Sequence, residues 1–481
     1  MRREACLSVA LLAVFTLAAC GGGGGGSTPH AAQSSSVSGT IYGVDSNTIN
    51  LNGGTGCGYV NVTYTGATQI SYNGYSLAPG VYAAVTGTGS CTTSFAASQI
   101  RLGAAPSFSS GAPAGPHVPT ADYVGYGGSQ SISPAVAATV LNWAELTPGV
   151  ANGFSAAGIK TLAYINPFFQ ATTDPLYSSD ESTFAHDCNG DRITTMANAT
   201  VLLYLMNPSS PDLLNLLNTW AAQQEASGHI DAFFFDDVDT LYGVSPLPCN
   251  ATQSSWDAAN ASFISGANYP VVFNGYAEDS DSATLINGAN VTGGMVEYCY
   301  TGTAPLYTTG SQWVLHENLQ LAAGAAGKLF FCYNNTTTDG SSSTALREYV
   351  YASFLLTYNP ASSILWEYFS TPSNVHVFPE TGLVPSSPLV ATPANISGID
   401  YANVYIREYA ACSLAGKSVG PCAAVVNADP SNSYALPPLS GTYGHTMTLS
   451  GYGTLDGGTV GTAGPPPPTT VPPQTGLVLL P

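Results

Sequence analysis

Three carboxylates follow a short apolar run in the middle of the chain, and their types and spacing suit catalysis. The run Ile230–Phe235 is interrupted only by Asp231 and is followed by Asp236, Asp237 and Asp239. Only 8% of the 481 residues are charged, so three acids within four positions form a concentration. A short run that is apolar on both faces predicts a buried parallel strand. In a barrel of such strands the catalytic groups lie where the strands end.

A second carboxylate, Glu297, interrupts another apolar run. An unpaired charge within such a run is costly, which favours a functional role. Two carboxyl groups that flank a glycosidic bond can cleave it: one protonates the leaving oxygen, and the other acts as nucleophile or activates water. We therefore predict Asp236 as the nucleophile or base and Glu297 as the general acid.

Eight β-rich runs alternate with helical stretches between residues 120 and 379, which predicts an α/β fold, a parallel (β/α)8 TIM barrel. The helical stretches include 212–227 and 343–357. This order places Asp236 at the end of strand four and Glu297 on strand six. The predicted barrel strands are Asp122–Tyr126, Thr161–Ile165, Val201–Leu205, Ile230–Phe235, Pro270–Phe273, Gly294–Tyr298, Leu329–Tyr333 and Ser363–Glu367.

The residues at the predicted strand ends are mostly amides, tyrosines and carboxylates. Such groups hydrogen-bond and stack without demanding charge, which suits a hydroxyl-rich ligand such as a polysaccharide. No lysine lies at a strand end, which argues against Schiff-base chemistry. Instead of binding substrate, Asp237 and Asp239 could cap the following loop or orient Asp236. The tyrosines could instead pack in the barrel core. The predicted substrate-binding residues are Asp237, Tyr126, Asn166, Asn207, Asn274, Glu278, Tyr298, Asn334 and Glu367.

The motifs around both carboxylates resemble one family of glycoside hydrolases. Ile230–Asp239 is similar to the Asp-Gly-(apolar)-Phe-Leu-Asp-x-x-Asp strand of glycoside hydrolase family 114, the endo-α-1,4-polygalactosaminidases, and of related hypothetical bacterial glycoside hydrolases. Gly293–Glu297 is similar to their sixth strand, which ends in glutamate. Ala232 stands where the family has glycine, and Asp237 adds an acid. The resemblance implies a TIM barrel that hydrolyses an amino-sugar polymer. Segments resembling the post-barrel part of the hypothetical group are 377–381, 404–409 and 424–427.

The chain shows β patterns on both sides of the predicted barrel. Residues 37–103 consist of short alternating runs separated by turn residues, which predicts a small antiparallel β-barrel or sandwich of about five strands. A linker rich in Ala, Pro, Ser and Gly follows at 104–119. Residues 380–481 return to β patterns and include a proline-rich stretch, which predicts an antiparallel β-domain packed on the barrel.

The first 20 residues resemble a bacterial lipoprotein signal. A charged start precedes the apolar run Leu7–Leu17, and Leu-Ala-Ala-Cys then ends at Cys20. We expect Cys20 to be lipidated and residues 21–36 to form a Gly/Ser tether; secretion with an incidental cysteine is the alternative. Because Gly21 follows the cysteine, the resemblance implies an outer-membrane lipoprotein of the cell envelope, either periplasmic or surface-exposed.

The other cysteines predict disulfides. Once Cys6 and Cys20 are set aside, eight remain, an even number in a chain expected to be exported. Sequential pairing is simplest, because 57/91 and 412/422 would then each stay within one domain. No CxxC or HxxxH spacing is present, so we expect no metal site and no cofactor.

The net charge of −20 argues against nucleic acid as a partner. The sequence thus predicts an extracytoplasmic glycoside hydrolase that is monomeric and contacts the membrane only through its anchor. A surface glycan-binding protein that has lost catalysis is the alternative. A metal-dependent hydrolase using Asp236, Asp237 and Asp239 ranks last, because these acids lack histidine partners.

Overall fold

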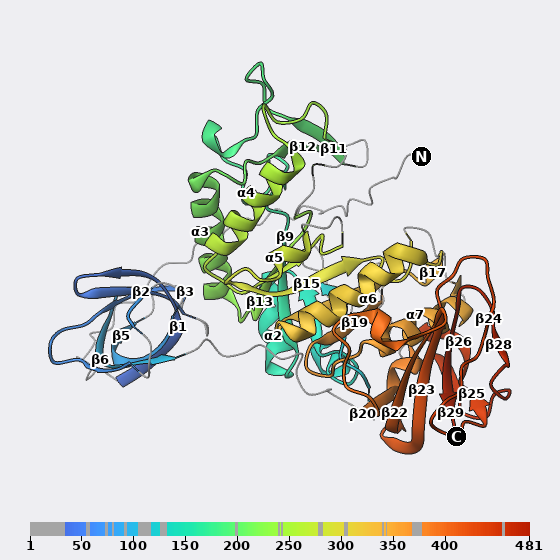
Figure 1. The fold of residues 1–481 in the computed structure, drawn as a ribbon. Coiled ribbons are helices and arrows are strands. Elements are labelled where there is room, and N and C mark those ends of the chain that lie inside the picture. The colour runs from blue at the N-terminus through green and yellow to red at the C-terminus, as the bar shows by residue number, and fades with distance from the viewer. Residues whose placement is uncertain are drawn as a thin grey trace.

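The protein consists of a central barrel with β-rich units before and after it in the chain (Figure 1). No helix in the described part of the chain is long and apolar enough to cross a membrane. The computed structural model describes residues 34–53, 58–72, 76–78, 81–90, 94–103, 117–125, 132–197, 201–238, 241, 244–277, 282–302, 306–338, 341–342, 344–367, 378–454 and 457–481.

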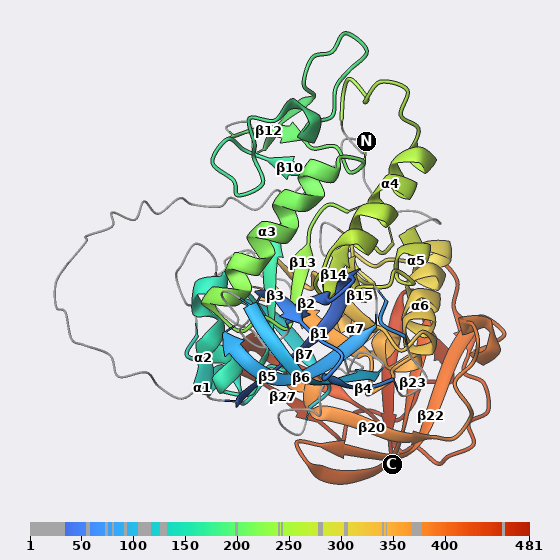
Figure 2. The same cartoon turned by 90° about the vertical axis from the view of Figure 1, so that its left-hand side faces the viewer.

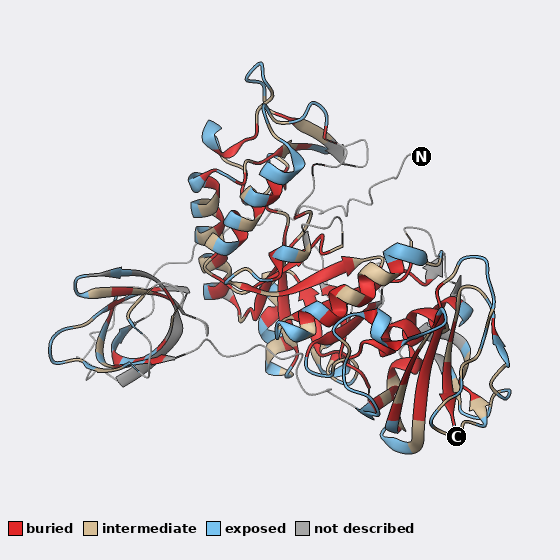
Figure 3. Ribbon diagram, in the orientation of Figure 1, coloured by how far each residue is buried: buried red, intermediate tan, exposed pale blue. Residues whose placement is uncertain are grey.

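Eight parallel strands close into a barrel, which confirms the predicted fold class. The ring closes where Leu365 of the last strand pairs with Thr120 of the first. Figure 3 shows these strands as the most deeply buried part of the central unit. In chain order the barrel strands are β7 (Thr120–Gly125), β8 (Trp143–Leu146), β9 (Lys160–Ile165), β13 (Ala232–Phe235), β14 (Val271–Asn274), β15 (Val291–Glu297), β16 (Leu329–Asn334) and β19 (Ser363–Glu367).

The barrel interior is filled by large apolar side chains. Within it, the Phe331 ring makes T-shaped contacts with Trp143 and Trp366, and Phe234 packs on Trp366 at a tilt. Side chains alternate between the two faces of a strand, so the residues two positions further along point the same way. The packed interior residues therefore fix the positions of the side chains that come next on the same strands, at the C-terminal end of the barrel.

One predicted barrel strand was wrong and another was missed. Val201–Leu205 forms β12 of a separate antiparallel sheet, with β10 (Phe169–Gln170) and β11 (Thr194–Ala197). The second barrel strand is instead β8, Trp143–Leu146. A β-rich run does not reveal whether its partners will be parallel or antiparallel, and β8 is only four residues long with a charge inside it. Because one error replaced the other, β13 and β15 keep their predicted places as strands four and six.

Helices connect the barrel strands, and their starts carry recognisable caps. Ser210 caps α3 with Pro211 following, and Thr252 and Ser255 form a capping box at the start of α4. The two helices anticipated from the sequence correspond to α3 and α7. The helices of the barrel unit are α1 (Pro134–Ala137), η1 (Pro148–Val150), α2 (Ala151–Ala156), η2 (Glu181–Thr183), α3 (Pro211–Ser227), α4 (Gln253–Gly266), α5 (Ser282–Leu285), α6 (Gly310–Ala325) and α7 (Thr344–Leu356).

An extension made of residues 166–210 stands above α3 and α4 (Figure 2). It contains the sheet of β10, β12 and β11, and it leaves the barrel directly after β9. The disulfide Cys188–Cys249 ties it to the loop that follows β13. Both of these loops leave the C-terminal ends of barrel strands, so the extension lies on the C-terminal side of the barrel.

The N-terminal unit is a small closed β-barrel. Five strands form a ring in the order β3-β2-β1-β5-β6, which closes through a parallel pairing of Val62 with Phe95, and β4 joins β6. The unit therefore has one strand more than predicted and two parallel pairings. The strands are β1 (Ser34–Asp45), β2 (Thr48–Gly53), β3 (Gly58–Thr63), β4 (Gln69–Ser71), β5 (Tyr82–Ser90) and β6 (Ser94–Gly103).

The C-terminal unit is antiparallel, as predicted, and packs on α7. One face of its main sheet contributes Val426 and Val478 to the barrel's outer core, and the other face has a small core of its own. A fully buried ion pair joins the units: Arg347 Nε of α7 donates to Glu380 Oε1 at 2.8 Å. The elements are η3 (Pro379–Gly382), β20 (Leu383–Pro388), η4 (Ile396–Ile399), β21 (Asp400–Tyr401), β22 (Val404–Leu414), β23 (Lys417–Asn427), β24 (Tyr434–Ala435), β25 (His445–Thr446), β26 (Thr448–Thr454), β27 (Gly457–Gly461), β28 (Thr470–Val471) and β29 (Thr475–Leu480).

Three disulfides confirm the sequential pairing of the cysteines that they contain. They join Cys188 to Cys249, Cys299 to Cys332, and Cys412 to Cys422. Cys57 and Cys91, the predicted fourth pair, lie outside the described residues. Disulfides of this number are typical of proteins of the cell exterior or periplasm.

The N-terminal end of the barrel holds a buried acid away from the catalytic side. Glu225 of α3 is 3% exposed, and burial raises its pKa to about 8, opposed in part by the nearby His229. Beside it Asp231 accepts from Lys160 Nζ at 2.8 Å and from the backbone of Thr161, a structural role.

Glu225 should make the protein less stable as the pH rises. Its folded pKa lies above that of an unfolded glutamate, so its stability contribution is complete below pH ~4.5 and is lost as the pH approaches 8. The loss amounts to at most about 5 kcal/mol. Chemical denaturation at pH 5 to 8 should show Glu225→Gln with a clearly flatter decline in unfolding free energy than the wild type. An unchanged slope would assign the pH dependence to other groups.

Candidate active site

Asp236 and Glu297 meet at the C-terminal end of the barrel, joined by one amide. The Asn274 Nδ2 atom lies 2.9 Å from Asp236 Oδ1 and 2.9 Å from Glu297 Oε2. These two carboxylate oxygens therefore lie no further apart than twice 2.9 Å. The nitrogen end of the amide must face them, because a carbonyl oxygen could donate to neither. Strands β13, β14 and β15 are neighbours in the barrel, which is why their ends converge.

Both oxygens of Asp236 are held by donors. Tyr164 Oη donates to Asp236 Oδ2 at 2.7 Å, and the Asp237 backbone N–H donates to Oδ1 at 3.0 Å. Together with Asn274, these bonds orient the carboxyl group. Burial, and then the charges of Asp236 and Asp237, raise the pKa of Tyr164 well above its ordinary value. Tyr164 therefore keeps its proton and remains a donor to Asp236.

Asp237 is bound within the loop beside the site. Its Oδ2 atom accepts from Asn166 Nδ2 at 2.6 Å, and Asn166 Oδ1 in turn accepts from the backbone N–H groups of Phe168 and Phe169. Asp237 has a φ of 51°, in the left-handed region that a non-glycine residue rarely occupies. The bond between Asn166 and Asp237 links the end of β13 to the start of the extension, which suits the alternative role of Asp237 in orienting Asp236.

Tyr298 lies directly after Glu297 and also adopts a left-handed φ, 58°. Its ring centroid is 6.2 Å from that of Tyr333, the residue that pairs with Glu297 across β15 and β16. Tyr298 is partly exposed. The structure thus brings together Asp236, Asp237, Asn166, Asn274, Glu297 and Tyr298 of the predicted site residues.

Two other predicted substrate-binding residues have their side chains bonded within the protein, Asn207 away from the barrel and Asn334 at the end of β16. Asn207 precedes α3 in the extension, where its side chain accepts from the Ser209 N–H, because the run before it is not a barrel strand. Asn334 is fully buried, and its amide donates to the Trp366 carbonyl at 3.0 Å. Outside the described residues lie Tyr126, Glu278, Asp239 and Cys20, and for Glu367 only the backbone, at the end of β19, is described.

Glu145 is an interior acid that was missed in the sequence together with its strand. It lies two positions after the interior residue Trp143, so it points into the barrel, and it is fully buried. It pairs in register with Tyr123 and Leu162, and its charge adds to the effects that raise the pKa of Tyr164. The available signal was the period-two pattern of Trp143-Ala-Glu145, which is too short to call a strand.

Comparisons with known proteins return distant barrels. No protein-family model matches the chain, and no curated protein does. Among solved structures, Aspergillus fumigatus Ega3 in complex with galactosamine is 14% identical, over 53% of this chain and 93% of that one, with a TM-score of 0.35. Isomaltulose synthase from Klebsiella sp. LX3 is 8% identical, over 76% and 98%, with a TM-score of 0.39.

A third similar structure is a cycloisomaltooligosaccharide glucanotransferase from Paenibacillus sp.. It is 11% identical over 83% of this chain, with a TM-score of 0.34, and this chain spans 58% of its length. Similarities at this level assign no activity. At the C-terminal end of the barrel, the carboxyl groups of Asp236 and Glu297 lie close together, and Asp236 is oriented through both of its oxygens.

Proposed function

We propose that this protein is a glycoside hydrolase that cleaves a polysaccharide, with Asp236 as nucleophile or base and Glu297 as general acid. The supporting observation is the pair of carboxyl groups bridged by Asn274 at the ends of β13 and β15. Hydrolysis of a glycosidic bond requires two such groups on either side of the scissile bond. The barrel's C-terminal end is also where enzymes of this fold have their active sites.

The short separation of the pair favours a retaining mechanism with Asp236 as nucleophile. The carboxyl groups of retaining enzymes lie about 5–5.5 Å apart, whereas inverting enzymes need about 6.5–9.5 Å to admit a water molecule. The nearest oxygens of Asp236 and Glu297 are separated by at most twice 2.9 Å. Attack by Asp236 would form a glycosyl-enzyme bond while Glu297 protonates the leaving oxygen. Glu297 would then remove a proton from the water that hydrolyses this bond.

The experiment is digestion of a panel of purified polysaccharides, with reducing ends measured over time. Release from one of them supports the proposal, and NMR of the first product distinguishes a retained from an inverted anomeric centre. A protein that binds a glycan in the panel but releases no reducing ends is a glycan-binding protein instead.

The enzyme is proposed to work outside the cytoplasm, tethered by lipid at Cys20. The signal-like residues 1–20 and the three disulfides support this location. In a bacterial host, Cys20→Ala should move the protein from the membrane fraction to the soluble fraction. Membrane retention of this variant would contradict the anchor.

The substrate is proposed to be an amino-sugar polymer, as the resemblance to family 114 implies. The chain has 29 acidic against nine basic residues, so a polymer with free amines would be drawn toward it, and salt would screen the attraction. Hydrolysis of a partly deacetylated galactosaminan should therefore slow as NaCl is raised, while that of the fully acetylated polymer should change little. Equal rates of hydrolysis of both polymers at low salt would show that charge plays no part in recognition.

A further inference from the structure

The segment Tyr298–Thr301, which directly follows the proposed general acid Glu297, has an unfavourable backbone conformation at two of its residues. Tyr298 and Tyr300, on either side of Cys299, have φ values of 58° and 60°. A non-glycine residue in the left-handed region is energetically unfavourable and persists only where its surroundings impose it. The groups that hold Tyr298–Thr301 in this shape therefore also determine where Glu297, the residue before it, is directed.

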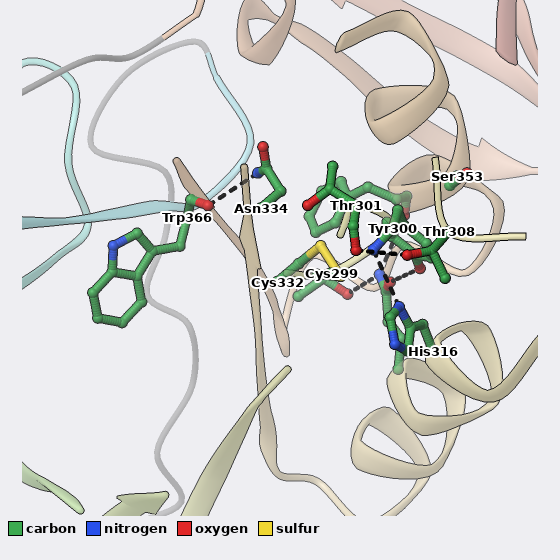
Figure 4. The surroundings of a disulfide bond; sticks show 12 residues. Cys299, Tyr300, Thr301, Thr308, His316, Cys332, Asn334, Ser353 and Trp366 are labelled. Atoms are coloured by element: carbon green, nitrogen blue, oxygen red, sulfur yellow. Dashed lines mark hydrogen bonds between the residues drawn. A yellow bond between two sulfur atoms is a disulfide. The ribbon is translucent and has the colours of Figure 1, made fainter. Parts of the chain in front are cut away.

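The first restraint on this segment is the disulfide between Cys299 and Cys332 of β16 (Figure 4). Both cysteines are fully buried. The Cys299 backbone N–H also donates to the Tyr333 carbonyl at 2.6 Å, although β15 has already ended at Glu297. Cys332 pairs in register with Val296, so the disulfide fastens the exit segment to the strand that neighbours the acid.

The second restraint is His316 of α6, whose ring lies beside the backbone of Tyr300 (Figure 4). The Tyr300 backbone N–H donates to His316 Nδ1 at 3.1 Å, and Tyr300 Oη donates to Gln320 Oε1 at 3.1 Å. An N–H group can only donate, so Nδ1 accepts and carries no proton. The proton of the neutral ring is then on Nε2, where the Gln312 side-chain amide, 3.1 Å away, accepts it with its oxygen turned toward the ring. Burial lowers the pKa of His316 to about 3, so the imidazole stays neutral and keeps its acceptor.

We propose that His316 and the Cys299–Cys332 disulfide form a clamp that positions Glu297 for general acid catalysis. The disulfide and the bond from Tyr300 act on the adjacent residues Cys299 and Tyr300 of one short strained turn, which begins directly after Glu297. This inference rests on the proposed function, in which Glu297 is the acid. A purely structural role would lower stability and affect all substrates alike, whereas a positioning role affects those reactions that need the acid.

The test is leaving-group dependence in His316→Leu, which removes the acceptor at similar size. Assays would use the polysaccharide that the wild type hydrolyses and an aryl glycoside of the same sugar with an activated leaving group. A misplaced acid can cost about 10²-fold. We expect kcat on the polysaccharide to fall about that much and KM to change little. The first step with the activated glycoside, measured as kcat/KM or as the initial burst of released aryl group, should stay within about threefold, because an activated leaving group needs little protonation. His316→Asn, which can keep an acceptor near Nδ1, should restore most of the loss.

A second pair of variants covers the case in which His316→Leu does not fold. Removing the disulfide with Cys299→Ala and Cys332→Ala should give the same selective loss on the polysaccharide. The matched control removes the Cys412–Cys422 disulfide of the C-terminal unit, which should lower Tm without changing the ratio of the two activities. Equal losses on both substrates would overturn the clamp. A wild type with no activity on any glycan would instead overturn the proposed function.

Discussion

Asp236→Asn should reduce kcat on the polysaccharide by about 10⁴-fold, the scale of loss seen when a catalytic group that acts covalently is removed. The amide has nearly the shape of the carboxyl group, so Tyr164 and Asn274 retain a neighbour of the same size. An amide is a poor nucleophile and a poor base, so the chemistry is lost while the fold is kept. The measurement is the initial rate of reducing-end release, with Tm recorded for each variant.

The matched control is Asp237→Asn, one residue further along the chain. Asp237 is bonded to Asn166 within the loop, so its loss should disturb the position of Asp236 and lower kcat by about tenfold, the cost of a small misplacement. A larger loss in Asp237→Asn than in Asp236→Asn would mean that the two carboxylates have been assigned the wrong way round.

Glu297→Gln should reduce kcat on the polysaccharide by about 10²–10⁴-fold, the range that general acid catalysis contributes. A sugar hydroxyl is a poor leaving group unless it is protonated, and glutamine cannot supply the proton. The first step with an activated aryl glycoside should be much less affected, because its leaving group departs without protonation. Comparing the two substrates in one variant therefore separates loss of the acid from general damage to the site.

Glu348 provides a matched control for this prediction. It is a partly buried acid of α7 whose pKa is raised to about 7, chiefly by burial, yet it lies where α7 meets the C-terminal unit. A raised pKa taken alone would suggest Glu348 as a general acid, whereas position in the barrel selects Glu297. Glu348→Gln should leave kcat within about twofold. A large loss there with an active Glu297→Gln would refute the assignment.

The sequence by itself was enough to locate the two acids and the barrel. The apolar run before Asp236 and the glutamate that interrupts the run at Glu297 are local patterns, and most of the barrel strands are short β-rich apolar runs that can be read locally as strands. The order of the strands then follows from the order of the runs. The three observed disulfides also follow a sequential rule, because each joins cysteines that neighbour one another along the chain.

The tertiary structure alone decided which runs pair with which. Val201–Leu205 is β-rich like a barrel strand, yet its partners are the antiparallel strands β10 and β11. Strand pairing depends on contacts between residues far apart in the chain, which composition does not encode locally. Trp143–Leu146 shows the converse, since a four-residue strand that contains Glu145 is recognisable only once its neighbours β7 and β9 are in place.

The arrangement of the site also required the closed barrel. Asn274 was anticipated at a strand end, but its place between Asp236 and Glu297 depends on β14 lying between β13 and β15. The contact from Tyr164 to Asp236 crosses from β9 to β13, and the contact from His316 to Tyr300 joins a helix to a strand end. Residue types are a property of the chain, whereas the distances between their side chains are set by packing, and only those distances bring the two separate acids together as a pair.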